Sequence, residues 1–363
     1  MSTHKYPKYT IHKKELYNAG EILRKGHTIN NFQAWYDSYI LLERWRSMHA
    51  YPMNTFQANI RRILKKNGLD KRAIVAQRLK RLPSILLKLS RFKTMRLERM
   101  QDIGGLRIIL PTVNDVNTMR NALKASKWKH RLCREKDYIT NPQESGYRSI
   151  HLIYEYNNIQ APPEYQGLHV EIQLRTKMQH IWATTVETIG TFIEHSLKSS
   201  QGPQEWLDYL KLAGEVFALE EKTNPHPNYL SFSPEELIEK LHKKTRELNT
   251  FQMLNTFHQA VRFNESRKFK NKYILLQIDV SNNRGYASVY NLKDLEKASN
   301  AYGDLERTQT NAQDAVLVSS SSLSELRKAY PNYFVDASEF IKQLSRIFKK
   351  YNLPDIPITK DTI

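Results

Sequence analysis

Five short motifs between Arg78 and Thr176 are rich in side chains that bind phosphate groups and divalent metal ions. Together they supply two separated acids, many cations, one aromatic residue beside a glycine, and two turn-forming glycine sites. Carboxylates and phosphate oxygens are the ligands that Mg²⁺ prefers, while cationic side chains bind the phosphates themselves. The set indicates metal-dependent transfer of a phosphate group from a nucleotide. The motifs are Arg78–Lys88, Asp102–Arg107, Lys136–Ile139, Ser145–His151 and Glu171–Thr176.

The first motif predicts a triphosphate site at the start of a helix. In an extended segment, Arg78 and Lys80 lie on the same side because strand side chains alternate. Pro83 suits the first turn of a helix, and Ser84 and Lys88 then share one face near its positive N-terminus. A solvated basic helix is the alternative, and it explains Lys88 by itself better than it explains the whole set.

The two acids are candidates for metal ligation. Asp102 precedes an Ile-Gly-Gly turn and a strand, whereas Glu171 lies within a second strand, with Gln173 on the same face. A single strand carboxylate is usually solvated or ion-paired. Two carboxylates from separate strands beside many cations favour a metal site, in which one acid could also act as a base.

Tyr147 follows Gly146, and the glycine predicts a turn that presents the tyrosine for stacking against a nucleotide base. The alternative is an ordinary core tyrosine.

Hydrophobic periodicity predicts an α/β protein built from two units. The first unit combines helices and strands, with helices expected at 11–66, 115–128, 177–198, 204–222 and 234–249, and strands at 106–110, 151–156 and 168–174. The second is a small α+β unit, with strands at 272–280, 285–290 and 315–319 and helices at 292–302, 322–329 and 336–350. We therefore place the domains at 1–268 and 269–363, and expect a loose tail from Pro354 to Lys360.

Composition favours a cytoplasmic protein with no membrane segment. Hydrophobic residues make up 40% of the 363-residue chain, which is enough for real cores, yet no apolar run is long enough to span a bilayer. The N-terminal residues lack the apolar stretch of a secretory signal. Cys133 is the single cysteine, which excludes an internal disulfide and a cysteine-rich zinc site.

The positive charge is concentrated in residues 1–100. That segment has 22 Lys and Arg against 6 Asp and Glu, within a net charge of +19 for the whole chain. Such an excess attracts polyanions and raises their encounter rate, so a nucleic-acid partner is favoured over a merely solvated surface.

The ordered motifs R-x-K-x3-S-x3-K, D-I-G-G-x-R, K-D-Y-I, G-Y-x-S-x-H and E-x-Q-x-R-T resemble the synthetase domain of the RelA/SpoT family over about residues 78–187. The resemblance implies a nucleotidyltransferase-like mixed sheet flanked by helices. It also implies Mg²⁺-dependent transfer of the ATP β,γ-pyrophosphate to a ribose 3′-hydroxyl.

The same resemblance implies a role for each motif residue. Arg78 would stack on the ATP adenine, with Lys80, Ser84 and Lys88 on its phosphates. Asp102 and Glu171 would hold Mg²⁺, and Glu171 would also activate the acceptor hydroxyl. Tyr147 would stack on the acceptor base. The residues that would support the acceptor site are His151, Gln173, Arg107 and Lys136.

One departure from the family pattern bears on the acceptor. Alarmone synthetases usually have the motif P-K-x-N-G-Y, which ends in the stacking tyrosine. Here Gln143, Glu144 and Ser145 follow Pro142, so the Lys and the Asn are absent. Loss of the Lys and Asn weakens the grip on a GDP diphosphate. The segment 179–187 resembles the toxin branch, which pyrophosphorylates the 3′ CCA end of tRNA. A small alarmone synthetase that uses GDP or GTP is the alternative, and a catalytically dead RNA-binding protein is a third possibility.

The C-terminal unit resembles the pseudo-zinc-finger of fused toxin–antitoxin proteins of the CapRel type. Tyr330 and Tyr333 form a Y-x-x-Y element, which in those proteins blocks the ATP site until a phage capsid protein binds. The resemblance implies an autoinhibited enzyme of anti-phage defence, triggered by a phage capsid or other structural protein. The alternative is a surface turn with core tyrosines, since Tyr6 and Tyr9 show the same spacing.

Overall fold

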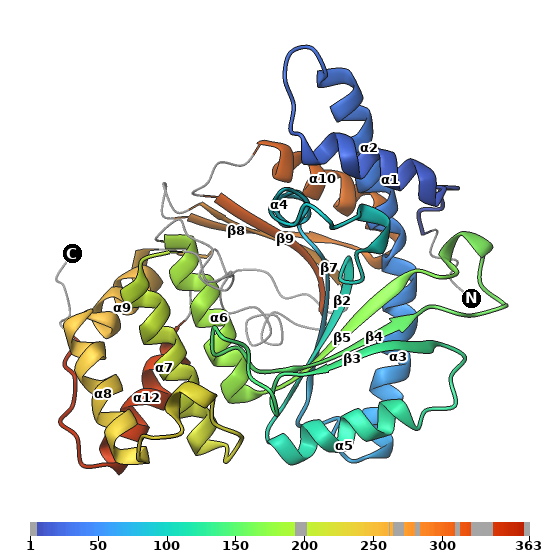
Figure 1. The fold of residues 1–363 in the computed structure, drawn as a ribbon. Coiled ribbons are helices and arrows are strands. Elements are labelled where there is room, and N and C mark those ends of the chain that lie inside the picture. Colours follow the sequence, from blue (N-terminus) through green and yellow to red (C-terminus); the bar gives the residue numbers. More distant parts are fainter. Residues whose placement is uncertain are drawn as a thin grey trace.

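The central element is a mixed sheet that joins strands from both predicted units (Figure 1). The structure is a computed structural model, and it describes residues 6–192, 202–260, 262–263, 272–279, 284–308, 313–320 and 337–358. The strand order in the described part is β3-β4-β5-β2-β1-β9-β7-β8-β6. The strands are β1 (Ile74–Leu79), β2 (Gly104–Leu110), β3 (Arg131–Asp137), β4 (Ile150–Glu155), β5 (His169–Thr176), β6 (Arg262–Phe263), β7 (Lys272–Asp279), β8 (Arg284–Tyr290) and β9 (Gln313–Ser320).

The first five strands confirm the expected mixed sheet flanked by helices. β2 and β5 are parallel neighbours, and the other pairs among β1 to β5 are antiparallel. The helix α5 lies between β2 and β3 in the chain, close to its expected position. β3 was missed because it is an edge strand that carries charged side chains along its length, so it lacks the apolar alternation of a half-buried strand.

Most helices lie in the expected regions with shifted ends, but no helix was expected at Thr250–Ala260. They are α1 (Lys13–Arg24), α2 (Phe32–Met48), α3 (Ala50–Lys66), α4 (Leu82–Arg91), α5 (Val113–Lys124), α6 (Lys177–Phe192), α7 (Gln204–Glu220), α8 (Pro234–Glu247), α9 (Thr250–Ala260), α10 (Leu295–Thr308) and α12 (Ser338–Lys350). The helix expected at 322–329 lies outside the described residues. None of the helices in the described part is long and apolar enough to cross a membrane.

The two faces of the five-strand sheet differ in chemistry. One face is apolar, with Leu106, Ile108 and Ile172 fully buried against α3 and α5 in the main core. Because side chains alternate along a strand, the residues between them point to the opposite face. That face carries the charged residues of the sequence motifs, so the sheet separates the core from the candidate site.

A second core forms where α6, α7, α8, α9 and α12 pack together (Figure 1). The tail was expected to be loose, but it packs on this bundle as far as residue 358. The His242 Nε2 atom lies 2.9 Å from the Pro354 carbonyl oxygen, and Ile356 and Ile358 contact the bundle core. Two isoleucines can bury apolar area there, which the proline-rich composition of the tail did not indicate.

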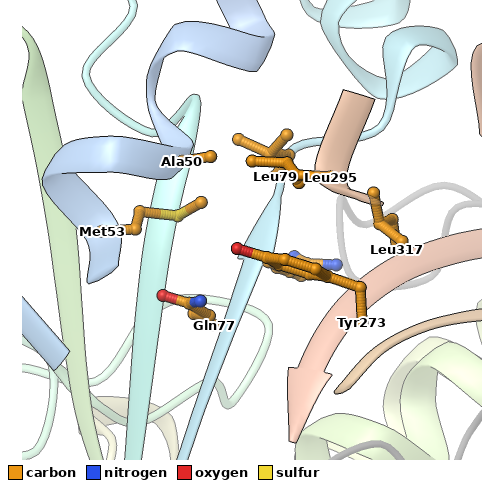
Figure 2. A pocket seen from close by; sticks show the side chains of 8 residues that line it. Ala50, Met53, Gln77, Leu79, Tyr273, Leu295 and Leu317 are labelled. Atoms are coloured by element: carbon orange, nitrogen blue, oxygen red, sulfur yellow. The ribbon is translucent and has the colours of Figure 1, made fainter. Parts of the chain in front are cut away.

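The C-terminal unit is joined to the first unit through the sheet itself. β9 pairs antiparallel with β1, so that Val318 lies opposite Arg78. Nearby, Tyr273 on β7 accepts a 3.0 Å hydrogen bond from Asn54 on α3. Figure 2 shows Tyr273 reaching across the small apolar pocket at this junction, which has about 20 Å³ of free volume. The predicted boundary near 268 lies outside the described residues and stays a prediction.

Candidate active site

Sheet register brings the expected acceptor residues into one row. Lys136 on β3 is opposite His151 on β4, which is opposite Gln173 on β5, which is opposite Arg107 on β2. Directly opposed residues point to the same face of a sheet. Residues from four strands, separated by up to 66 positions in the chain, are therefore neighbours on the charged face.

The next row along the sheet contains Glu171 and Arg78. Glu171 is opposite Gly105, and Gly105 is opposite Arg78 on β1. The glycine places no side chain between the acid and the arginine. Asp102 precedes β2 by two residues, so both candidate metal ligands lie near this row.

Asp102 is held by the two lysines that the sequence assigned to phosphate binding. Its carboxylate accepts hydrogen bonds from Lys80 Nζ at 2.9 Å and from Lys88 Nζ at 3.0 Å. Burial alone would raise the pKa of the Asp102 carboxyl, but the two ammonium groups outweigh it and hold the pKa well below its usual range. Asp102 is therefore an anion that already has two cationic partners.

The helix α4 places one of these lysines as expected. Arg81 is its extended N-cap residue and Pro83 lies in its first turn. Ser84 and Lys88 are both half-buried and one helical turn apart. The two side chains therefore share one helix face, as their spacing predicted.

Glu171 forms a second anionic centre with a different partner. Its carboxylate lies 2.8 Å from His151 Nδ1 and accepts a 2.7 Å hydrogen bond from Gln173 Nε2. Burial would raise the pKa of Glu171, but His151 outweighs it and lowers the pKa to about 2. The Asp102 charge acts in the opposite direction, which is evidence that the two acids are close together.

His151 is correspondingly a cation at neutral pH. Burial would lower its pKa, but Tyr147 and Glu171 outweigh burial and raise the pKa to about 9. The Tyr147 hydroxyl lies 2.8 Å from His151 Nε2. The imidazolium thus links the tyrosine to the acid.

The pairing of His151 with Glu171 predicts a pH-dependent stability. The raised pKa means that the His151 contribution is complete below about pH 6.5 and is lost as the pH rises through about 9. We expect the free energy of unfolding of the protein to fall over that window by on the order of 3 kcal/mol more than in His151→Gln. Urea denaturation of both proteins from pH 6 to pH 10 measures this. Parallel curves would show that His151 does not hold a proton for Glu171.

Tyr147 does not lie as an exposed stacking platform. Only 4% of it is exposed, and its ring packs edge-on to Tyr138 and His151 and against Trp182. The turn at Gly146 is present, with φ of 86°, but the α6–α7 bundle covers the tyrosine. Tyr138 is more exposed than Tyr147: it is half-buried, and its ring centroid lies 5.8 Å from Lys136 Nζ. Tyr138 stands in the K-D-Y-I motif, so a signal for it was present.

Arg175, like Tyr138, was not given a role from the sequence. It is fully buried and donates a 2.6 Å hydrogen bond to the Gln173 side-chain oxygen. Among the described residues, its Nε and Nη1 atoms have no hydrogen-bond partner. A buried guanidinium with unused donors suits an oxygen of a ligand or of water. Its position two residues after Gln173 on an alternating strand was the available signal.

The start of α4 is held by a residue of the C-terminal unit. Glu306 on α10 accepts a 2.7 Å hydrogen bond from the Leu82 backbone N–H and a 2.6 Å hydrogen bond from Arg46. The Arg46 and Glu306 side chains are only 4% and 0% exposed. Arg46 also donates to the Lys80 carbonyl oxygen at 3.2 Å. A carboxylate at a helix N-terminus accepts from free N–H groups and interacts favourably with the helix dipole, so Glu306 stabilises the start of α4.

Asp102 and Glu171 fit a magnesium site. Two carboxylates near neighbouring strands, beside cations that would hold phosphates, are the donors with which proteins bind Mg²⁺ together with a nucleotide. The lysines on Asp102 mean that this carboxylate is free for a metal only when phosphate oxygens take over the two ammonium groups.

Comparison with known proteins agrees with the sequence motifs. The family described as "Region found in RelA / SpoT proteins" matches residues 77–192, which contain the candidate site. Residues 77–192 of this chain are therefore similar to a region found in RelA/SpoT proteins.

Two curated relatives come from Bacillus subtilis (strain 168). The GTP pyrophosphokinase YjbM is 39% identical over 125 residues, which are 34% of this chain and 54% of the relative. The GTP pyrophosphokinase YwaC is 35% identical over 146 residues, which are 38% of this chain and 65% of the relative. The chain thus spans less than two thirds of either relative. The crystal structure of small alarmone synthetase 1 from Bacillus subtilis bound to its product pppGpp is 27% identical, with a TM-score of 0.42, and the match covers 52% of this chain and 94% of that chain.

Proposed function

We propose that this chain is a magnesium-dependent pyrophosphokinase, which transfers the β,γ-pyrophosphate of ATP to a ribose 3′-hydroxyl. The observation that carries the proposal is the placement of two acids beside neighbouring strands. Asp102, which pairs with Lys80 and Lys88, lies just before β2, and β2 is the parallel neighbour of the strand that carries Glu171. In the reaction, the 3′-oxygen bonds to the β-phosphorus, the bond from that phosphorus to the α,β-bridging oxygen breaks, and AMP leaves. The hydroxyl proton is released in the same exchange.

The residues divide this work between two ends of the site. Lys80, Ser84 and Lys88 bind the ATP phosphates, and Arg78 stacks on the adenine. The phosphates draw the lysines away from Asp102, whose carboxylate then joins Glu171 as a metal ligand. Bound Mg²⁺ neutralises charge on the phosphates and aligns the groups that react.

Glu171 accepts the hydroxyl proton in this proposal. While Glu171 is paired with His151, the Glu171 carboxyl has a pKa of about 2 and is a weak base. An acceptor ribose that displaces His151 from Glu171 would remove that stabilisation and raise its basicity. The described arrangement is therefore that of a resting site, in which the acid gains strength as a base only when the acceptor binds.

The names of the curated relatives favour a guanosine nucleotide as the acceptor. Both are GTP pyrophosphokinases, and the related solved structure holds pppGpp as its product. The comparisons therefore support GDP or GTP as the acceptor better than tRNA, which would make the protein a small alarmone synthetase.

Two features of this chain favour the 3′ CCA end of tRNA instead. In the irregular loop before Tyr147, Glu144 forms a 2.7 Å ion pair with Lys211 and lies 3.3 Å from His226 Nε2. The loop therefore adds a negative charge and engages a nearby cation, which opposes binding of a nucleoside diphosphate. The excess positive charge of residues 1–100 suits a large polyanion.

An acceptor competition distinguishes these two substrates. The protein is incubated with γ-labelled ATP, Mg²⁺, GDP and deacylated tRNA, and the label is followed into each acceptor. Label in tRNA that is lost when the terminal adenosine is removed supports the tRNA reading. Label in guanosine tetraphosphate with unlabelled tRNA would establish the alarmone synthetase. Glu144→Lys is expected to shift the product ratio towards the guanosine nucleotide.

We further propose that the C-terminal unit regulates this site. Its β9 strand pairs with β1 beside Arg78, and its α10 helix supplies Glu306 to the start of α4. Any displacement of the unit therefore acts on the segment that binds ATP. Tyr330 and Tyr333, the proposed blocking residues, lie outside the described residues, and a phage capsid or other structural protein is the proposed trigger.

Autoinhibition predicts a gain of activity from the double substitution Tyr330→Ala and Tyr333→Ala. We expect higher pyrophosphate transfer and greater toxicity when this variant is expressed without a trigger, because the block on the ATP site is removed. The substitution of Tyr6 and Tyr9, which have the same spacing, is the matched control. Truncation near residue 270 is less informative, since it also removes Glu306 and β9. Equal activity of the double variant and the unchanged protein would contradict the clamp.

A further inference from the structure

Three side chains of metal-binding type gather on the sheet beside the candidate site. They are Cys133 on β3, Glu155 on β4 and His169 on β5. Glu155 and His169 are directly opposite in the ladder. Cys133 lies where the register of β3 shifts between Leu132 and Arg134, so the irregularity turns an otherwise unpaired residue towards the other two.

The cluster is close to Glu171 but separate from it. His169 and Glu171 are two residues apart on one strand, so they share a face at a Cα spacing of about 7 Å. The Glu171 partners are His151 and Gln173, and neither belongs to the cluster. Its donor set also differs, because it combines sulfur, nitrogen and oxygen where the candidate magnesium site offers oxygen alone.

The spacing of the ligand atoms suits a tetrahedral metal. One atom from each side chain lies within 4.8 Å of the others, and Cys133 Sγ is 4.0 Å from Glu155 Oε2. Ligand atoms around a tetrahedral zinc ion are about 3.3–3.8 Å apart, given metal–ligand bonds of about 2.0–2.3 Å. The three side chains are half-buried, so small rotations close the difference.

Two neighbouring cations compete with a metal and set its affinity. Arg131 forms an ion pair with Glu155, and Lys13 acts electrostatically on His169. The Arg131 side chain is 65% exposed, and exposed ion pairs of this kind are weak. The arginine is therefore free to turn into solvent when a divalent ion takes its place.

We propose that Cys133, Glu155 and His169 bind a zinc ion, with a fourth coordination position left for water. Mixed thiolate, imidazole and carboxylate donors select zinc over magnesium or calcium. Binding displaces the thiol proton. The ion would cross-link β3, β4 and β5 at the point where the β3 ladder is interrupted, and so brace the edge strand that carries Lys136.

Cobalt substitution tests the site, because Cys133 is the single cysteine of the chain. Titration of the intact reduced protein with Co²⁺ is expected to give one thiolate-to-cobalt charge-transfer band that saturates at one equivalent and is removed by Zn²⁺. Cys133→Ser should abolish the band, and His169→Ala should weaken binding about tenfold or more. Asp102→Asn should retain it, which separates this site from the magnesium site.

Two further measurements test the zinc site even if Cys133→Ser or His169→Ala fails to fold. Zn²⁺ should protect Cys133 of the unchanged protein from a thiol reagent, whereas equimolar Mg²⁺ should not. Arg131→Ala, which removes the competing cation, should tighten Co²⁺ binding. Saturating Co²⁺ without a charge-transfer band, or thiol reactivity that Zn²⁺ does not change, would overturn the proposal.

Discussion

Replacement of Glu171 by Gln is expected to lower pyrophosphate transfer by about 10²–10⁴-fold while the fold is retained. The amide cannot take the hydroxyl proton, and it is a poorer metal ligand than the carboxylate. The measurement is the rate of label transfer from ATP at saturating acceptor, together with toxicity on expression. The His151 pKa should fall in the same variant, because Glu171 helps to hold its proton.

Glu239→Gln is the matched control, since this exposed glutamate lies on α8, outside the site. It should leave both the transfer rate and the toxicity unchanged. If Glu171→Gln kept full toxicity, the chain would act by binding RNA without catalysis. If toxicity and label transfer are lost together, a catalytically dead RNA-binding protein is excluded.

Replacement of Glu306 by Gln is expected to destabilise the protein by about 3–5 kcal/mol, because it leaves the buried Arg46 charge without its partner. The amide oxygen can still accept from Leu82, so the loss reports mainly on the charge pair. Urea denaturation measures the free energy of unfolding. Amide hydrogen exchange at the start of α4 measures the local effect, and we expect faster exchange there.

Asp304→Asn provides the control on the same helix. Asp304 pairs with Arg307 but its side chain is 68% exposed, so its loss should change the free energy of unfolding by about 0.5 kcal/mol or less. The double change Arg46→Met with Glu306→Leu should recover part of the stability by removing both charges. Equal effects of Glu306→Gln and Asp304→Asn would show that α10 does not anchor α4.

Backbone periodicity correctly predicted which candidate residues within one element share a face. Helical spacing was enough to place Ser84 and Lys88 on one face, because both lie in one helix. Strand alternation was enough to place Glu171 and Gln173 on one face, because both lie in one strand. Of β1, only the end was recognised, in the extended segment predicted from Arg78 to Lys80. β1 has six residues and its burial does not alternate regularly, so it gives a weak periodic signal.

The exposure of Tyr147 could not be predicted from local sequence. Gly146 correctly predicted a turn, but whether the tyrosine faces solvent depends on α6 and α7, which pack over it from elsewhere in the chain. The same limit applies to Glu306, which is 260 residues from its partner Arg46. Burial and ion pairing across such separations are properties of the packed molecule.

The sequence by itself determined the kind of chemistry, since carboxylates, lysines and glycines at these spacings suit a nucleotide, its phosphates and a magnesium ion. It also determined which residues share a strand or helix face, because that follows from the backbone repeat. Only the tertiary structure decided how the elements are combined. Strand register placed Glu171 across Gly105 from Arg78, and the fold brought the lysines onto Asp102. β9 and Glu306 attached the C-terminal unit to β1 and to the start of α4. These contacts form between residues far apart in the chain, so no local pattern specifies them.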